Sequence, residues 1–96
     1  MKKNIRIIVA DDNSLVREML VDGIADQKDF EILATASNGR ETIELIKEHE
    51  PDVVLLDLVM PIVDGLGVME AVREDNNGKV PYFIIVSAEG KEDIAT

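Results

Sequence analysis

At residues 53–57 the chain reads VVLLD, a continuous apolar run that ends in an aspartate. Such a run is typical of a strand covered on both faces, as the strands of parallel sheets are. Pro51 stands just before it and ends any preceding helix, because proline cannot continue one. We therefore expect a central strand over residues 53–56, with Asp57 at its carboxyl end.

The segments on either side repeat an alternation of short apolar runs with longer stretches whose apolar residues recur three and four apart. This pattern predicts strands over residues 5–10, 30–36 and 80–86, and helices over residues 14–24, 38–49 and 66–74. Strands and helices that alternate in this way form βαβ units around a parallel sheet. The predicted fold class is therefore α/β, and the strand of mixed character at residues 30–36 is expected at an edge.

The expected helices have recognisable starts and apolar faces. Asn13 or Ser14 can cap the first helix, and Asn38 with Glu41 resembles a capping box at the start of the second. The residues expected to pack inward are Leu15, Val16, Met19, Leu20 and Ile24 in the first helix, Ile43 and Ile46 in the second, and Leu66, Met69 and Val72 in the third. Tyr82, inside the last predicted strand, is also expected to be packed.

Composition limits the classes of function. A chain of 96 residues with 46% hydrophobic and 31% charged side chains is expected to fold as a single domain over residues 1–96. A net charge of −10 repels nucleic-acid phosphates and anionic lipids, so neither nucleic acid nor membrane is an expected partner of this chain. The absence of cysteine and of any signal or membrane-spanning segment predicts a cytoplasmic protein.

Two of the expected strands end in aspartate: Asp11 and Asp12 close the first strand, and Asp57 closes the third. If these strands are neighbours, ~4.8 Å apart, their carboxylates converge where open α/β sheets bind ligands. Clustered carboxylates repel unless a cation neutralises them, and an oxygen-only set favours a hard ion such as Mg²⁺. One aspartate can then act as a nucleophile toward a phosphoryl group. A single aspartate after a strand is more often a polar exit or a helix cap, so the joint placement carries this prediction.

Several motifs, in order along the chain, resemble those of the response regulator receiver domain. They are VADDN at 9–13, Asn38-Gly39, the segment from Pro51-Asp52 to Asp57, Met60-Pro61, Asp64-Gly65 and Val86-Ser87-Ala88. The resemblance implies an open parallel sheet of the flavodoxin or CheY-like kind, with strand order 2-1-3-4 and helices on both faces. It also implies a phosphorelay receiver that takes a phosphoryl group from a histidine kinase or histidine phosphotransferase and switches an effector. No turnover enzyme is expected, beyond self-phosphorylation and autodephosphorylation.

The same resemblance implies roles for individual residues. Asp57 would be the phosphoacceptor, and Asp12 would ligate Mg²⁺ or Mn²⁺ directly, with Asp11 acting partly through water. Asp57 itself and the backbone carbonyl of Val59 would complete the protein ligands. Ser87 would be the switch hydroxyl that hydrogen-bonds a phosphoryl oxygen.

A narrower resemblance, at residues 7–13, 60–66 and 87–93, is to the receiver of a sporulation-initiation transcription factor. It implies DNA binding through a missing C-terminal effector domain rather than through this chain. Receivers normally continue into a fifth strand and a fifth helix, which are expected to be missing here. Lys91 is expected to be solvated and not to replace the lysine of that missing part. An apolar strand over residues 80–86 without that cover predicts self-association.

Two other classes of function remain open. A hydrolase with an aspartate nucleophile would also use Asp57, but such enzymes commonly place a second aspartate two residues later, where Val59 stands. A binding-only receiver-like interaction module, not phosphorylated in this truncated form, would signal through contacts alone. It would be expected to lack part of the acidic cluster, whereas Asp11, Asp12 and Asp57 are all present. Titration with Mg²⁺ separates these classes, because only those with an acidic site predict a response that Asp57→Asn abolishes.

Overall fold

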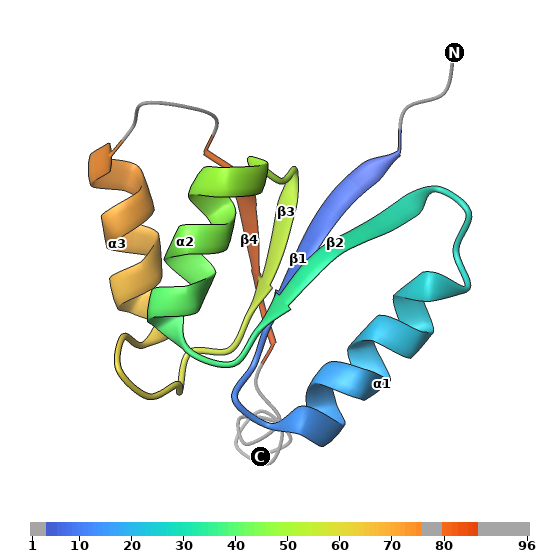
Figure 1. Cartoon of the computed structure of the whole chain (residues 1–96), viewed down its shortest axis with the longest axis horizontal. Coiled ribbons are helices and arrows are strands. Elements are labelled where there is room, and N and C mark those ends of the chain that lie inside the picture. Colours follow the sequence, from blue (N-terminus) through green and yellow to red (C-terminus); the bar gives the residue numbers. More distant parts are fainter. Residues whose placement is uncertain (1–3, 76–79, 87–96) are drawn as a thin grey trace, which may run out of the picture.

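The computed structural model describes residues 4–75 and 80–86, which form an open α/β sheet with helices on both faces (Figure 1). The elements are β1 (Ile5–Ala10), α1 (Ser14–Ala25), β2 (Phe30–Ala36), α2 (Gly39–His49), β3 (Val53–Leu56), α3 (Gly65–Asp75) and β4 (Tyr82–Ile85). All strand pairs are parallel, in the order β2-β1-β3-β4. The predicted fold class and strand order are confirmed, with β2 at an edge and β3 between β1 and β4.

The main core lies between the sheet and the pair α2 and α3. Alternate residues of a strand face the same side, and the buried residues of β1 and β3 on this side pack with residues from both helices. They are Ile8, Ala10, Val54 and Leu56 from the strands and Ile46, Val68 and Val72 from the helices. Burying each large apolar side chain stabilises the fold by roughly 1.5–3 kcal/mol. The predicted inward face of α2 is confirmed, since Ile46 is buried and Ile43 packs against this cluster.

Helix α1 lies on the opposite side of the sheet from α2 and α3 (Figure 1). Asn13 caps it, with Oδ1 accepting from the amides of Leu15 at 2.9 Å and Val16 at 3.2 Å. The helix buries none of its residues fully. Val16 is half-buried, as are Leu20 and Ile24, but Leu15 and Met19 are 69% and 72% exposed, so the prediction that these two pack was wrong. The half-buried face of α1 also includes Arg17 and Val21, and this face contacts β1 and β2.

Helix α2 begins at an N-cap with a small departure from the expected capping box. Oδ1 of Asn38 accepts from the Glu41 amide at 2.8 Å, as predicted. The Glu41 carboxylate, however, accepts from the amide of Ser37 at 2.7 Å instead of that of Asn38. The reciprocal bond therefore closes one residue earlier, and it ties the end of β2 to the first turn of α2.

Helix α3 is rotated relative to the prediction. Leu66 was expected to pack but is 60% exposed, while Val68 is fully buried and Val72 nearly so. Met69 is half-buried and packs against the core, as predicted. Gly65, Val68 and Val72 are the buried residues of this helix, three and four positions apart, and that stripe leaves Leu66 facing outward.

Strand β4 covers Tyr82–Ile85, which is shorter than the predicted residues 80–86. Phe83 packs against the core cluster, so its neighbour Tyr82 points to the other face, where α1 contacts β1 and β2. Tyr82 is 79% exposed, and the prediction that it is packed was wrong. The sequence also predicts a turn at Asp75-Asn76-Asn77-Gly78 and the beginning of a further helix over residues 89–96, and residues 76–79 and 87–96 lie outside the described part of the chain. Within residues 4–75 and 80–86, no helix is long and apolar enough to cross a membrane.

Candidate functional site

The parallel register of the strands places Asp11 and Asp57 side by side. Ala10 on β1 pairs with Leu56 on β3, and the Asp57 amide donates to the Ala10 carbonyl at 3.0 Å. The Asp11 amide donates to the carbonyl of Ala36 on β2, also at 3.0 Å. Main-chain hydrogen bonds therefore hold both aspartates at the carboxyl edge of the sheet.

Three carboxylates gather at this edge, from Asp11, Asp12 and Asp57. One oxygen of each lies within 4.8 Å of the others. Asp11 and Asp57 are only 2% and 8% exposed, while Asp12 is exposed. The predicted convergence of these side chains is therefore observed, and their individual roles stay predictions. Like charges this close repel strongly, more so where burial lowers the effective dielectric constant.

Asp57 shows the electrostatic consequence. Burial raises the pKa of its carboxyl above the ordinary value of 3.8, and the charges of Asp11 and Asp12 raise the pKa further. The Val59 amide, which donates to Oδ1 of Asp57 at 3.1 Å, acts in the opposite direction. The ionised carboxylate is thus held where it is poorly solvated, and a nearby cation would relieve this cost.

The donor set fits a hard divalent cation. All three candidate side chains are carboxylates, which Mg²⁺ and Mn²⁺ prefer, and the chain contains no cysteine. His49, the single histidine, ends α2 at the other edge of the sheet. The amide of Asn13 donates to Oδ1 of Asp11 at 2.9 Å, so this buried carboxylate is oriented by the backbone, as that of Asp57 is by Val59.

The other two predicted site residues, Val59 and Ser87, do not belong to the carboxylate cluster. Val59 lies in the loop after β3, with its side chain 60% exposed, and the predicted role of its carbonyl as a metal ligand stays a prediction. Ser87 lies outside the described residues. The preceding residue, Val86, donates its amide to the carbonyl of Leu56 at 2.9 Å, directly before Asp57.

Arg17 is a residue of the site that sequence reasoning missed. Its Nη1 donates to the backbone carbonyl of Asp11 at 2.7 Å, so it fastens the loop from which the Asp11 and Asp12 side chains project. It also places a positive charge beside this acidic edge. The available signal was its position four residues after the N-cap Asn13, because helical side chains point back toward the helix N-terminus.

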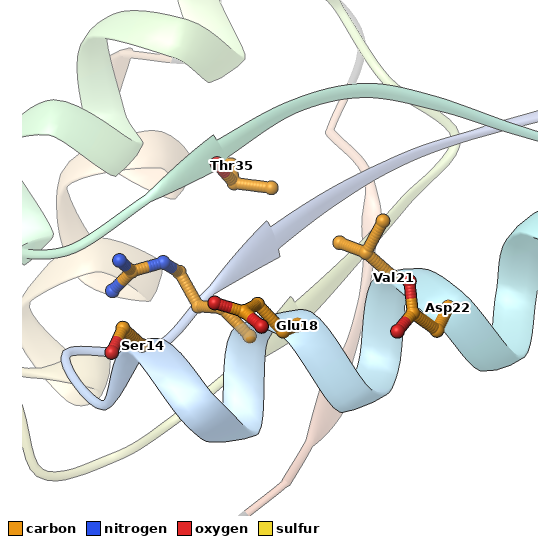
Figure 2. A pocket seen from close by; sticks show the side chains of 6 residues that line it. Ser14, Glu18, Val21, Asp22 and Thr35 are labelled. Atoms are coloured by element: carbon orange, nitrogen blue, oxygen red, sulfur yellow. The ribbon is translucent and has the colours of Figure 1, made fainter.

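A hollow of about 290 Å³ lies between α1 and β2 (Figure 2). Its lining consists of Ser14, Arg17, Glu18, Val21, Asp22 and Thr35, and none of the three clustered aspartates takes part. No lining residue is buried, and no buried side-chain polar atom in the described part of the chain lacks a hydrogen-bond partner. The hollow is thus an open surface feature that meets the site only through Arg17.

The fold and the acidic cluster together define an open-sheet α/β domain with three carboxylates gathered at the carboxyl ends of its strands. Residues 7–96 match the family model of the response regulator receiver domain, and the chain belongs to this family. The predicted family resemblance is confirmed.

Solved structures of similar fold agree with this membership. The signal receiver domain of a Mycobacterium tuberculosis protein assigned as the response regulator NarL has 36% identity and a TM-score of 0.84, covering 90% of this chain and 68% of that one. A LuxR-family DNA-binding response regulator of Staphylococcus aureus has 38% identity and a TM-score of 0.78, with coverages of 85% and 67%. A chain from the CheX-CheY-BeF3-Mg²⁺ complex of Borrelia burgdorferi has 29% identity to this chain and a TM-score of 0.78, covering 96% of this chain and 68% of that one. The chain spans about two thirds of the length of each.

Proposed function

We propose that this receiver domain accepts a phosphoryl group on Asp57 from the phosphohistidine of a histidine kinase or histidine phosphotransferase. The observation that carries this proposal is the gathering of three carboxylates within 4.8 Å at the carboxyl edge of the sheet. Membership of the receiver family supports the two-component role. The hydrolase alternative lacks a corresponding observation, since Val59 stands where its second aspartate is expected.

Asp11, Asp12 and Asp57, with the carbonyl of Val59, would hold Mg²⁺ or Mn²⁺. The similar CheY of Borrelia burgdorferi was solved in a complex that includes Mg²⁺, which supports the same ion here. When bound, the ion supplies positive charge that offsets the carboxylates and the oxygens of an incoming phosphoryl group. The raised pKa of Asp57 is consistent with a carboxylate that such a charge would stabilise.

The residues of the chain orient the reaction. The Val59 amide holds Oδ1 of Asp57, and main-chain bonds to β1 fix the residue itself, so the carboxylate has a defined direction for attack. A carboxylate oxygen of Asp57 forms a bond to phosphorus as the N–P bond of the phosphohistidine breaks, and the imidazole nitrogen keeps that electron pair. Ser87 would then donate its hydroxyl to a phosphoryl oxygen. The product is an aspartyl phosphate on the protein, so the domain acts as a switch and not as a turnover enzyme.

Intact mass after incubation with Mg²⁺ and acetyl phosphate tests this function. We expect wild-type protein to gain one phosphoryl group, and Asp57→Asn to gain none. Asp22→Asn, an exposed acid on α1 outside the cluster, is the matched control and should still gain it. An adduct that persists in Asp57→Asn would contradict the assignment. Absence of an adduct in wild type would favour the binding-only module.

The output of the domain is expected to be transcriptional. One similar structure is a DNA-binding response regulator, and that supports an attached effector domain that binds DNA, of which a sporulation-initiation factor would be one case. The net charge of −10 opposes DNA binding by this chain itself. Electrophoretic mobility shift with the chain alone should therefore show no complex, and a complex with unrelated duplex DNA would contradict this assignment of roles.

The chain is also expected to self-associate through β4. Tyr82, Ile84 and Ile85 are 79%, 50% and 43% exposed, and among the described strands β4 has only β3 as a neighbour. Exposed apolar edge strands pair with other chains. Light scattering should give a mass that rises with concentration in wild type and stays monomeric in Ile84→Lys. A monomeric mass for wild type at all concentrations would contradict the expectation.

A further inference from the structure

The loop between Asp57 and α3 is held in an unusual conformation. The Gly65 amide donates to the Leu58 carbonyl at 3.0 Å and closes the loop at its base. The Val63 amide donates to the Pro61 carbonyl at 2.8 Å, which makes a γ-turn centred on Ile62, whose φ is 73°. A β-branched residue rarely adopts a positive φ, so contacts around the loop must hold this turn in place.

Val63 is the point at which this loop meets α2. A Cβ atom added to Gly39, the first residue of α2, would lie 1.8 Å from the Val63 carbonyl oxygen and 2.6 Å from its carbonyl carbon. Real Cβ atoms essentially never come within 3.0 Å of a heavy atom outside their own residue and its chain neighbours. The φ of Gly39 is not positive, so the backbone conformation does not require glycine there. Close approach of the Val63 carbonyl is therefore the reason why position 39 has no room for a side chain.

The contact is also favourable electrostatically. The Val63 carbonyl oxygen carries partial negative charge and lies beside the first residue of α2, at the positive end of the helix dipole. Gly39 itself is buried. The Val63 carbonyl thus occupies the space beside Gly39 that a side chain at the first position of α2 would fill. We call this contact between Val63 and Gly39 the seat of the loop.

The seat is connected to the acidic cluster through a short, anchored stretch of chain. Val63 packs against the core cluster, and Met60 belongs to that cluster with 7% exposure. Val59 directly precedes Met60, so its carbonyl belongs to a peptide whose other end is fixed in the core. Its amide donates to Oδ1 of Asp57 at 3.1 Å. A displacement of the loop would move that donor and the predicted carbonyl ligand together.

We propose that Gly39 is a positioning residue for the acidic site, because its missing side chain lets Val63 seat against α2 and so fixes the loop that orients Val59 and Asp57. The inference rests on the proposed function for its effect on metal binding. Its effect on the loop itself is independent of that function. Gly39 is not one of the three clustered carboxylates, and its close neighbour is Val63, so it acts through Val63.

A series of glycine-to-alanine variants tests the proposal, because the added Cβ atom clashes severely at Gly39, less at Gly67 and not at all at Gly23. In Gly67→Ala the new Cβ would meet Cγ1 of the Val63 side chain at 2.7 Å, which can move, and in Gly23→Ala it would meet nothing within 4 Å. By calorimetric titration of the whole chain, Gly39→Ala should weaken Mg²⁺ binding by at least ~10-fold, as loss of an outer-shell partner does. Gly67→Ala should weaken it less, and Gly23→Ala should leave it unchanged.

Two further measurements separate positioning from a loss of stability. Val72→Ala removes buried atoms from α3, and at an equal loss of stability it should bind Mg²⁺ as wild type does. In EDTA, hydrogen exchange of the Val59 amide should accelerate in Gly39→Ala and not in Val72→Ala or Gly23→Ala. If Gly39→Ala fails to fold, Val63→Ala, which loosens the same seat without adding atoms, should show both effects in weaker form.

The outcomes are distinct. Unchanged Val59 exchange and unchanged Mg²⁺ affinity in Gly39→Ala, or equal changes in Val72→Ala, would overturn the positioning role. Failure of wild-type protein to bind Mg²⁺ would instead overturn the proposed function, while the exchange of the Val59 amide would still decide whether Gly39 orients the loop.

Discussion

The two ends of β1 treat charge in opposite ways. At the amino end, the Arg6 amide donates to Asp52 at 2.8 Å, and the Arg6 guanidinium donates to the carbonyls of His49 at 2.8 Å and Glu50 at 3.0 Å. At the carboxyl end, like charges face one another, and within the described residues no salt bridge reaches Asp11, Asp12 or Asp57. At the first end the charged side chains join separate elements, whereas at the second Arg17 binds the Asp11 carbonyl and the three carboxylates keep a repulsion that a cation would relieve. Such perturbed groups are typical of functional sites.

The backbone shows a parallel contrast. Among the described residues, two residues other than glycine have positive φ, Glu50 at 48° near the amino end of the sheet and Ile62 at 73° near the carboxyl end. Glu50 ends α2 in the left-handed region, a frequent position for glycine, and Arg6 binds its carbonyl. Ile62 lies in the loop that starts at Asp57, and its apolar side chain is 71% exposed. The strain at one end belongs to a helix cap and at the other to the functional loop.

The largest expected effect separates the two ends by metal binding. Asp12→Asn should weaken Mg²⁺ binding by at least ~100-fold, because it removes the charge of a proposed ligand, and the loss of an outer-shell partner alone costs roughly 10–100-fold. Arg6→Met, at the opposite end, should leave the dissociation constant unchanged. Calorimetric titration at fixed pH and ionic strength measures both. Equal effects of the two substitutions would show that the ends are not functionally distinct.

The next effect concerns stability at the amino end. Arg6→Met should lower the free energy of unfolding by about 1–2 kcal/mol, because it leaves two carbonyls at the end of α2 without their charged donor. Arg40→Met, which removes an exposed arginine from the first turn of the same helix, should have no measurable effect. Urea denaturation followed by circular dichroism measures both. A similar loss in the two variants would argue against a capping role for Arg6.

A smaller effect is expected from the two left-handed residues. Glu50→Gly and Ile62→Gly should each raise the free energy of unfolding by about 0.5–1 kcal/mol, because glycine adopts this region without steric cost. Urea midpoints measure the change. The two variants should also differ in Mg²⁺ affinity. Only Ile62→Gly should alter it, because Ile62 lies in the loop after Asp57, whereas Glu50 lies at the other end of the sheet. A loss of stability in either variant would mean that the side chain contributes more than the strained backbone costs.

The smallest effect is the pH dependence at the carboxyl end. Below pH 3.8, the ordinary pKa of Asp57, its carboxyl is protonated whether folded or unfolded, so wild type and Asp57→Asn should be equally stable. As pH rises through 3.8 toward the raised pKa of the folded state, the unfolded chain releases its proton first, and wild type becomes less stable relative to Asp57→Asn. Above the folded pKa the deficit is constant.

Urea denaturation of both proteins in EDTA, at a series of pH values, measures this difference. Adding Mg²⁺ should stabilise wild type and leave Asp57→Asn almost unchanged. A difference that does not vary with pH, or a wild type that is the more stable protein at neutral pH in EDTA, would show that Asp57 is already compensated within the fold.

Much of the fold was predictable because its signals are local. The apolar run at residues 53–56 and the N-caps Asn13 and Asn38 act over a few residues, so strand and helix positions followed from the sequence. The convergence of Asp11 with Asp57 also followed, because parallel strands have their carboxyl ends at one edge. These features depend on the covalent order of residues and on the two short periods of regular structure.

Only the tertiary structure decided which residues are covered by another element and which distant parts of the chain come into close contact. Periodicity indicates which residues share a face but not which element covers it, so Leu15, Leu66 and Tyr82 were placed inside although they are exposed. The bond from Arg6 to the end of α2, and the fit of Gly39 against Val63, join residues far apart in the chain. No local pattern specifies such contacts, because they arise from how whole elements pack against one another. The sequence alone thus determined the elements and the acidic edge, while packing determined which faces are buried and what holds that edge in shape.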